Sequence, residues 1–313
     1  MSRALFLITG GAGFIGSHLV REVLGRGDRV RVLDNFLAGK RQNLAGVTGD
    51  LEIVEGDQRD PATCATAMKG VTYVLHIGAL PSVARSVSDP KASHDINING
   101  TFNLLMAARD AGVQRFVYSS SSSVYGNTPE LPKVEGMTPN PRSPYAVTKL
   151  TGEYYCSVFH SLFGLPTVAL RYFNVFGPRQ DPSSAYAAVI PRFIRALLKG
   201  EPLPVHGDGL QTRDFTYVAN AVHANLLACT AALTGPLVVN IGGGQRISLL
   251  DLVRELETLT GRKAALAFEA ARPGDVRDSQ ADITRAREQL GYAPVVDMTR
   301  GLEQTLAYFR SLD

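Results

Sequence analysis

Hydrophobic residues form short runs along the first half of the chain, and stretches of helical periodicity separate these runs. The runs cover residues 4–8, 30–33, 52–54, 73–77, 116–118 and 168–172. Helical patterns lie between them, near 15–25, 61–68, 96–111 and 144–162. Strands that alternate with helices form a parallel sheet with helices on both faces. The pattern therefore predicts an α/β fold with a doubly wound parallel sheet of the Rossmann type.

The alternation stops after Phe173. Residues 174–214 are rich in Gly, Pro and Arg, whereas 215–241 return to the earlier pattern. Further helices are predicted at 217–231, 248–260 and 299–311, and a further strand at 237–241. We expect one domain of residues 1–173 plus 215–241, and a smaller α/β domain of 174–214 plus 242–313. The second domain should pack over the carboxyl ends of the strands, where open α/β folds bind ligands.

A glycine-rich turn follows the first apolar run directly, and an amphipathic helix begins near Phe14. Glycine has no Cβ, so backbone N–H groups in such a turn can approach phosphate oxygens, and the helix dipole favours negative charge there. The spacing Gly11-x-Gly13-x-x-Gly16 matches the dinucleotide-binding fingerprint. The residues that we expect to bind the dinucleotide are Gly10, Gly13, Phe14, Ile15 and Gly16.

An acidic residue, Asp34, ends the second apolar run. A carboxylate at this place can accept both ribose hydroxyls of an adenosine and repels a 2′-phosphate, which predicts NAD rather than NADP. Lys40 and Arg41 lie in the loop that follows and could serve a phosphate, but the repulsion from Asp34 acts at close range, so NAD remains the predicted cofactor.

The composition excludes several classes of protein. The 313 residues are 45% hydrophobic and 19% charged, as in globular proteins. A net charge of +3, without basic runs interleaved with aromatics, argues against nucleic-acid binding. Cys64, Cys156 and Cys229 have neither disulfide nor metal-ligand spacing, so we expect a reducing cytoplasm and no metal site. The apolar runs are shorter than the roughly 20 residues of a membrane span.

Three polar side chains suggest catalysis. Tyr145 and Lys149 are four residues apart on a predicted helix that Ser143 and Pro144 start, so they share one face. A nearby ammonium should lower the pKa of a tyrosine, which is near 10 in the free side chain. Ser121 follows a strand at the same sheet edge and could bond a substrate hydroxyl. Together these groups could remove the proton of an alcohol while hydride leaves its carbon.

The chain resembles the extended short-chain dehydrogenases/reductases and, among them, the nucleotide-sugar 4-epimerases. The resemblance covers nearly the whole length. It is carried by Thr9–Gly16, Asp34-Asn35, Gly56-Asp57, SSSSSVYG at 119–126, SPYAVTKL at 143–150, LRYFNVFG at 170–177, GDGLQTRDFTYV at 207–218 and RPGD at 272–275.

The resemblance implies a role for each matching residue. Tyr145 would be the base, Lys149 would tune it and hold the nicotinamide ribose, and Ser121 would support the substrate hydroxyl. Cofactor contacts are further implied for Asn35, Asp57 (at adenine), Gln58 and Tyr172 (near the nicotinamide). Substrate contacts are implied for Ser82, Ser121, Ser122, Asn174, Gln180, Ala188, Val189, Arg213, Arg272, Asp275 and Ser279, with uracil near Val189, Ile190 and Phe193.

The residues after the serine separate two reactions of the resembled family. Its 4,6-dehydratases need an acid pair there, and Ser122 and Ser123 cannot act as carboxylates. The expected reaction is therefore 4-epimerisation of a UDP-hexose through a 4-keto intermediate, an isomerisation that regenerates NAD in each cycle.

The sugar remains open at this stage. In the resembled family, a small residue matching Ser279 leaves room for an N-acetyl group, which favours UDP-GlcNAc/UDP-GalNAc, with UDP-Glc/UDP-Gal also accepted. Pro81 departs from the glycine that such enzymes often carry. A UDP-glucuronate 4-epimerase is the close alternative, in which Arg179 or Arg192 would meet the carboxylate. A non-catalytic, NAD-sensing regulator is the alternative from another class.

By resemblance we expect a homodimer formed through helices 96–111 and 144–162.

Overall fold

A seven-stranded parallel sheet forms the centre of the protein, in the order β11-β6-β5-β4-β1-β2-β3. The computed structural model describes residues 3–182, 188–270 and 276–312. The strands are β1 (Leu5–Thr9), β2 (Arg29–Asp34), β3 (Leu51–Glu55), β4 (Tyr73–His76), β5 (Arg115–Ser121), β6 (Thr167–Tyr172) and β11 (Leu237–Ile241). Each predicted apolar run forms one of these strands, so the α/β prediction is confirmed.

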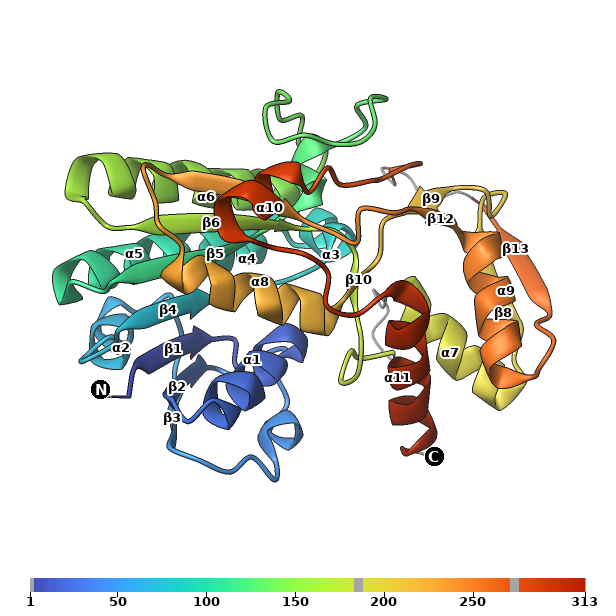
Figure 1. Ribbon diagram of the computed structural model, residues 1–313, viewed down its shortest axis with the longest axis horizontal. Coiled ribbons are helices and arrows are strands. Elements are labelled where there is room, and N and C mark those ends of the chain that lie inside the picture. The colour runs from blue at the N-terminus through green and yellow to red at the C-terminus, as the bar shows by residue number, and fades with distance from the viewer. Residues whose placement is uncertain (1–2, 183–187, 271–275, 313) are drawn as a thin grey trace.

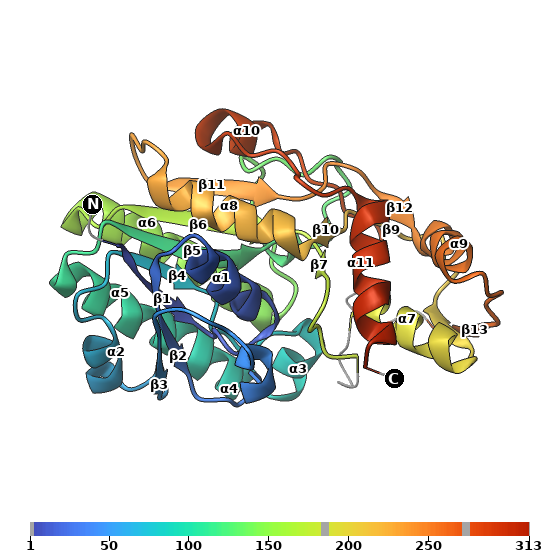
Figure 2. The ribbon, with the colours of Figure 1, turned by 60° about the horizontal axis from the view of Figure 1, so that its bottom comes forward.

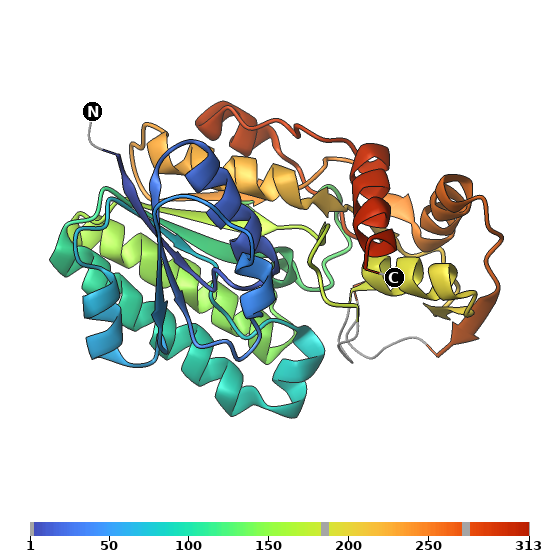
Figure 3. The same cartoon turned by 90° about the horizontal axis from the view of Figure 1, so that it is seen from below.

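Helices cover both faces of the sheet (Figures 1 and 3). Helices α1 (Phe14–Gly25) and α8 (Val218–Thr230) pack together on one face. Helices α2 (Pro61–Ala67), α5 (Gly100–Ala111) and α6 (Pro144–Phe163) pack on the other. Both faces of the central strands are therefore buried, which explains why their sequences are continuously apolar rather than alternating.

The predicted helix at 96–111 is not uniform. Residues Asp95–Asn99 form a π-helical turn between α4 (Pro90–His94) and α5. The turn carries Asn97, whose amide exchanges hydrogen bonds with the backbone of Leu80 (2.7 and 3.2 Å) and donates to Thr148 Oγ1 at 3.1 Å. Helix α3 (Val83–Ser88) lies just before α4 and is too short for periodicity to predict.

The remaining elements gather beyond the carboxyl ends of the strands, on the right of Figures 1 and 2. They are α7 (Val189–Lys199), β8 (Leu203–His206), β9 (Thr212–Arg213), β12 (Ile247–Ser248), α9 (Leu249–Thr260), β13 (Leu266–Glu269) and α11 (Met298–Arg310). The short strands β7 (Val175–Phe176) and β10 (Thr216–Tyr217) pair where the chain leaves the sheet. Helix α10 (Thr284–Leu290) instead packs against β11 and α8.

Two general features bear on the class of protein. The three cysteines are free and buried. In the parts of the chain that the structure describes, we find no helix with the length and apolarity needed to span a bilayer.

Candidate active site

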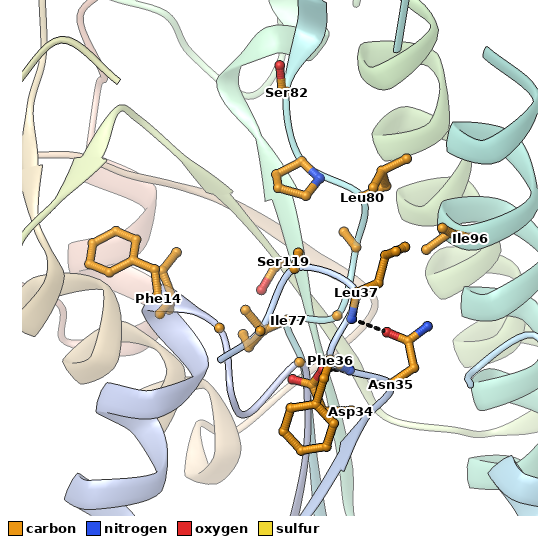
Figure 4. A pocket seen from close by; sticks show the side chains of 18 of the residues that line it. Phe14, Asp34, Asn35, Phe36, Leu37, Ile77, Leu80, Ser82, Ile96 and Ser119 are labelled. Carbon is orange, nitrogen blue, oxygen red and sulfur yellow. Dashed lines mark hydrogen bonds between the residues drawn. The ribbon is translucent and has the colours of Figure 1, made fainter. Parts of the chain in front are cut away.

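A cavity of about 760 Å³ opens at the carboxyl ends of β1, β2, β4 and β5 (Figure 4). Strands β2 and β3 lie on one side of β1 in the sheet, whereas β4, β5, β6 and β11 lie on the other side. Open α/β sheets bind ligands at such a switch in strand order. The position of the cavity therefore follows from the topology of the sheet.

The glycine turn closes tightly between β1 and α1. A Cβ on Gly16 would lie 2.1 Å from the carbonyl oxygen of Gly10, and Gly10 itself has a φ of +66°. Gly13 caps α1 without any side-chain hydrogen bond, so the first N–H groups of the helix are available to a phosphate. Gly10, Gly13, Phe14 and Ile15 line the cavity. Gly16 does not line it but packs behind the turn.

Asp34 faces the cavity and also bonds two backbone segments that form part of the cavity wall. Its carboxylate accepts the N–H of Ala12 at 2.9 Å and the N–H of Phe36 at 2.8 Å. A carboxylate has about four lone-pair sites, so two remain for ribose hydroxyls. Figure 4 shows Asp34 beside Asn35 and Phe36 at the end of β2.

The two cations of the following loop are held in ion pairs. Lys40 pairs with Asp181 at 2.7 Å, and Arg41 pairs with Glu55. A 2′-phosphate in this loop would therefore meet two further carboxylates besides Asp34. The arrangement fits a cofactor with free ribose hydroxyls, as in NAD.

Asp57, the residue predicted to contact adenine, lines the same cavity, as do Asn35 and Gln58. Asp57 accepts two hydrogen bonds from the Arg59 guanidinium (2.9 and 2.8 Å) and one from Asn35 at 2.7 Å. The bond from Arg59 is the main reason that the pKa of Asp57 falls to about 2. Gln58 points inward and donates to the carbonyl oxygens of Gly78 and Ile96.

Helix α6 positions the two catalytic candidates. Ser143 caps it by accepting the N–H of Ala146 at 3.1 Å. Tyr145 and Lys149 then stand one turn apart and line the cavity, together with Tyr172. Lys149 Nζ donates to the carbonyl oxygen of Ser119 at 2.7 Å and lies 5.9 Å from the centre of the Tyr145 ring.

The electrostatics of this pair differ from the prediction. Burial raises the pKa of Tyr145 to about 12, and a hydrogen bond with Ser121 opposes this rise. Burial also lowers the pKa of Lys149 to about 8, which Glu153 and Cys156 oppose. The prediction that Lys149 lowers the pKa of Tyr145 below its usual value is therefore wrong for these two side chains. The ammonium is bonded to a backbone carbonyl rather than to the phenol, and desolvation of the phenol dominates.

A second cavity, of about 270 Å³, adjoins the first, because Ala188 lines both. Its other lining residues include Asn174, Val189, Ile190, Phe193 and Arg213. The structure thus gathers most of the predicted nucleotide residues from β7, α7 and β9 in one place. Ser82 and Gln180 line the first cavity instead. Gln180 Oε1 is buried and has no hydrogen-bond partner among the described residues.

Some predicted residues line neither cavity. Ser121 and Ser122 lie just behind the wall at the end of β5, and Ser279 is buried. Ser279 Oγ accepts a hydrogen bond from Asn174 Nδ2 at 3.3 Å, so it touches a residue of the second cavity. Arg272 and Asp275 lie outside the described residues.

Sequence reasoning missed part of the cavity wall. The segment after β4, residues 77–81, lines the cavity because it leaves the sheet at the switch point. In the sequence, the only indication that this segment lines a site is that it follows an apolar run. Ser119, Ser120 and Arg179 also line the cavity. Arg179, for which the sequence predicts only a carboxylate contact, donates to Ser17 Oγ on α1 at 3.0 Å.

Comparison with known proteins identifies the family. Residues 6–242 match the model of the NAD dependent epimerase/dehydratase family. The chain belongs to this family. It is 39% identical to a UDP-glucose 4-epimerase from Mycolicibacterium smegmatis, over 97% of the chain and 98% of the relative. The predicted resemblance and the NAD cofactor are confirmed, and the chain is an NAD-dependent enzyme of the UDP-sugar 4-epimerase type.

Solved structures in this family are closely similar. The UDP-N-acetylglucosamine 4-epimerase from Methanobrevibacter ruminantium, in complex with UDP-N-acetylmuramic acid, has a TM-score of 0.95 at 37% identity and full coverage of both chains. The UDP-glucuronic acid 4-epimerase from Bacillus cereus, with UDP-glucuronic acid and NAD, has a TM-score of 0.92 at 34% identity, covering 99% and 100% of the two chains. These relatives are named for three different sugars.

Proposed function

We propose that the protein interconverts the C4 epimers of a UDP-hexose, with UDP-GlcNAc/UDP-GalNAc preferred and UDP-Glc/UDP-Gal accepted. The observation that carries the reaction type is that Tyr145 and Lys149 line the first cavity one helical turn apart, with Ser121 in hydrogen-bond contact with Tyr145. Neither Ser122 nor Ser123 offers a carboxylate, which favours epimerisation over dehydration. Family members named for different UDP-sugars support the substrate class.

In the proposed mechanism, Tyr145 takes the proton of the sugar 4-hydroxyl and Ser121 holds that hydroxyl by a hydrogen bond. NAD, which the glycine turn and Asp34 would hold, would supply the acceptor for the C4 hydride and, once reduced, the donor that gives the hydride back. Burial keeps the pKa of Tyr145 high, so the base needs neighbouring positive charge to act near neutral pH. Lys149 is the cation that the chain provides. Because Lys149 must stay charged, activity should fall as pH rises through its pKa.

The second cavity is the proposed site of the nucleotide. Val189, Ile190 and Phe193 supply an apolar wall suited to a base, and Arg213 supplies a cation for the diphosphate. Asn174 lies between this cavity and Ser279. We propose sugar contacts for Ser82, Gln180 and Ala188 because they line the first cavity beside the catalytic residues.

The function is tested with one substrate panel followed by NMR. UDP-Glc, UDP-GlcNAc and UDP-GlcA are each incubated with the purified protein, and C4 epimers are quantified. Turnover of UDP-GlcNAc supports the proposal. Turnover of UDP-GlcA alone would favour the glucuronate alternative. Bound NAD without conversion of any sugar would favour an NAD-sensing regulator.

Ser279→Tyr is expected to lower kcat/KM for UDP-GlcNAc by roughly 10- to 100-fold and to spare UDP-Glc, because a bulky residue would take the space of the N-acetyl group. Ser279→Ala is the matched control, since it removes the hydroxyl that Asn174 contacts but adds no volume. Both substrates are assayed with each variant. Undiminished turnover of UDP-GlcNAc by Ser279→Tyr would show that this residue does not limit the sugar.

We further propose a homodimer through α5 and α6. Val147, Tyr154, Val158 and Leu162 recur at helical spacing along α6 and remain 44–72% exposed. An apolar stripe of this length favours a protein interface. Leu162→Glu is expected to convert a dimer into a monomer in sedimentation experiments, because it places a charge in the contact. A wild-type protein that sediments as a monomer would contradict the proposal.

The division into two domains also stays a proposal. Residues 1–173 plus 215–241 contain the whole sheet, and most elements of 174–214 plus 242–313 gather beyond its carboxyl edge. Helix α10 is the part of the second group that packs on the sheet side, against β11.

A further inference from the structure

A buried carboxylate lies one helical turn beyond the catalytic lysine. Glu153 follows Lys149 by four residues on α6, so both side chains share one face of the helix. The Glu153 side chain is 3% exposed and Lys149 is 4% exposed. Neither the reaction nor cofactor binding, as described above, uses Glu153.

Two neighbouring side chains hold this carboxylate in place by hydrogen bonds. Arg171 on β6 donates from Nε to Oε1 at 2.9 Å and from Nη2 to Oε2 at 2.7 Å. Ser120 Oγ donates to the same Oε1. A bidentate guanidinium contact together with a hydroxyl donor is the arrangement that stabilises a buried carboxylate. The Arg171 guanidinium in turn lies over the ring of Tyr125 at 4.8 Å.

Glu153 also belongs to a regular connection between the sheet and the catalytic helix. The end of β5 carries three consecutive serines, and each bonds a different side chain of α6. The pairs are Ser119 (carbonyl) with Lys149, Ser120 with Glu153, and Ser121 with Tyr145. Glu153 is therefore fixed to the same strand end that places Tyr145 and Lys149.

Stability alone does not explain this buried pair. Replacing a buried ion pair by apolar residues of similar volume is often neutral or stabilising. An electrostatic effect of the Glu153 carboxylate on the neighbouring Lys149 ammonium would explain why an ion pair, rather than apolar side chains, occupies this buried site.

The other groups that face Lys149 cannot replace this charge. On α6 these are Tyr145 and Cys156, on β5 Tyr118, on β4 His76, and on β6 Arg171, which is bonded to Glu153. Burial raises the pKa of Tyr118, Tyr145 and Cys156, and it lowers the pKa of His76 to about 3, so all four are neutral near pH 7. Among the described residues around Lys149, Glu153 thus supplies the negative charge.

We propose that Glu153 is a positioning residue for the reaction, whose carboxylate keeps the Lys149 ammonium charged in its buried site, while Arg171 and Ser120 hold that carboxylate in place. This rests on the proposed function only in giving Lys149 a catalytic role. The electrostatics agree, because Glu153 opposes the fall in the pKa of Lys149 that burial causes. Without the Glu153 charge, Lys149 loses its proton at lower pH and Tyr145 loses its neighbouring cation.

The test compares Glu153→Gln, which removes the charge at nearly constant shape, with Glu153→Asp, which keeps the charge but loses a methylene. The Lys149 ammonium is titrated by NMR of lysine-labelled protein, with Lys149→Met to assign the signal. We expect Glu153→Gln to lower the pKa of Lys149 by about 1–3 units, the usual effect of one nearby opposite charge. Glu153→Asp should leave it within about half a unit of wild type.

The pH profile of kcat/KM provides the second readout. The alkaline limb of Glu153→Gln should move to lower pH by the same amount, so that activity near neutral pH falls roughly tenfold and recovers in acid. If Glu153 has only a structural role, both variants should have lower melting temperatures, while the alkaline limb of the pH profile and the Lys149 titration stay as in the wild type. That result overturns the proposal. If the protein turns over no UDP-sugar, the NMR titration still decides the electrostatic link.

If Glu153→Gln alone does not fold, Glu153→Gln is combined with Arg171→Gln, which removes both buried charges and leaves two amides that can bond each other. The Arg171 guanidinium is bonded to Glu153 and not to Lys149, whose ammonium donates to Ser119 O. The double variant should therefore lower the Lys149 pKa in the same direction, and an unshifted pKa would overturn the proposal.

Discussion

Tyr145→Phe is expected to lower kcat for C4 epimerisation by roughly 100- to 10,000-fold, the contribution typical of a general acid–base group. The substitution removes only the hydroxyl, and the ring that lines the cavity remains. The variant should therefore still purify with NAD. Epimer formation is followed by NMR, and the NAD content is measured by absorbance after denaturation.

The matched control for this prediction is Tyr154→Phe. Tyr154 lies on the same helix but is 59% exposed, and it lines neither cavity. Its variant should keep wild-type turnover. If Tyr145→Phe retained more than a tenth of wild-type kcat, another group would have to be the base.

Gly16→Ala is expected to weaken NAD binding by roughly 10- to 100-fold, so that the protein purifies with little cofactor and little activity. A Cβ at this position would lie 2.1 Å from Gly10 O and 2.8 Å from Gly11 Cα. These are backbone atoms, so the turn itself must move. Overpacking of this kind costs about 1–3 kcal/mol or more, and each 1.4 kcal/mol is tenfold in affinity. Isothermal titration with NAD measures the loss.

Gly25→Ala on the same helix is the control. A Cβ on Gly25 would meet nothing within 4 Å. Because alanine is the better helix former, this variant should bind NAD normally and gain up to about 1 kcal/mol of stability. Equal loss of NAD binding in both variants would mean that α1, rather than the turn, is what the substitutions disturb.

The fold could be predicted because its signals are local. Each strand of the sheet is a short apolar run between turns, and α6 carries its own start signal in Ser143 and Pro144. The π-helical turn at Asp95–Asn99 could not be predicted in this way. Its side chain Asn97 bonds Leu80 and Thr148, and such contacts between distant segments leave no periodic pattern in a sequence.

The candidate site likewise has a part that the sequence predicts and a part that it does not predict. Tyr145 and Lys149 were predictable because four residues on one helix fix their spacing. Their pKa values were not, since these depend on burial and on where the ammonium is bonded, which is Ser119 O. Glu153 has the same spacing from Lys149, but its hydrogen bonds with Arg171 on β6 could not be predicted from that spacing. The ion pair of Lys40 with Asp181 likewise joins segments far apart in the chain.

Asp34 constrains how the cofactor preference of this protein can change. Its carboxylate does two tasks at once, since it faces the cavity and also ties the N–H groups of Ala12 and Phe36 into the wall. A neutral side chain that admitted a 2′-phosphate would offer at most one acceptor where the carboxylate offers two, so the glycine turn or the loop after β2 would lose its anchor. A change from NAD to NADP at this position therefore carries a structural cost, which a second substitution would have to offset.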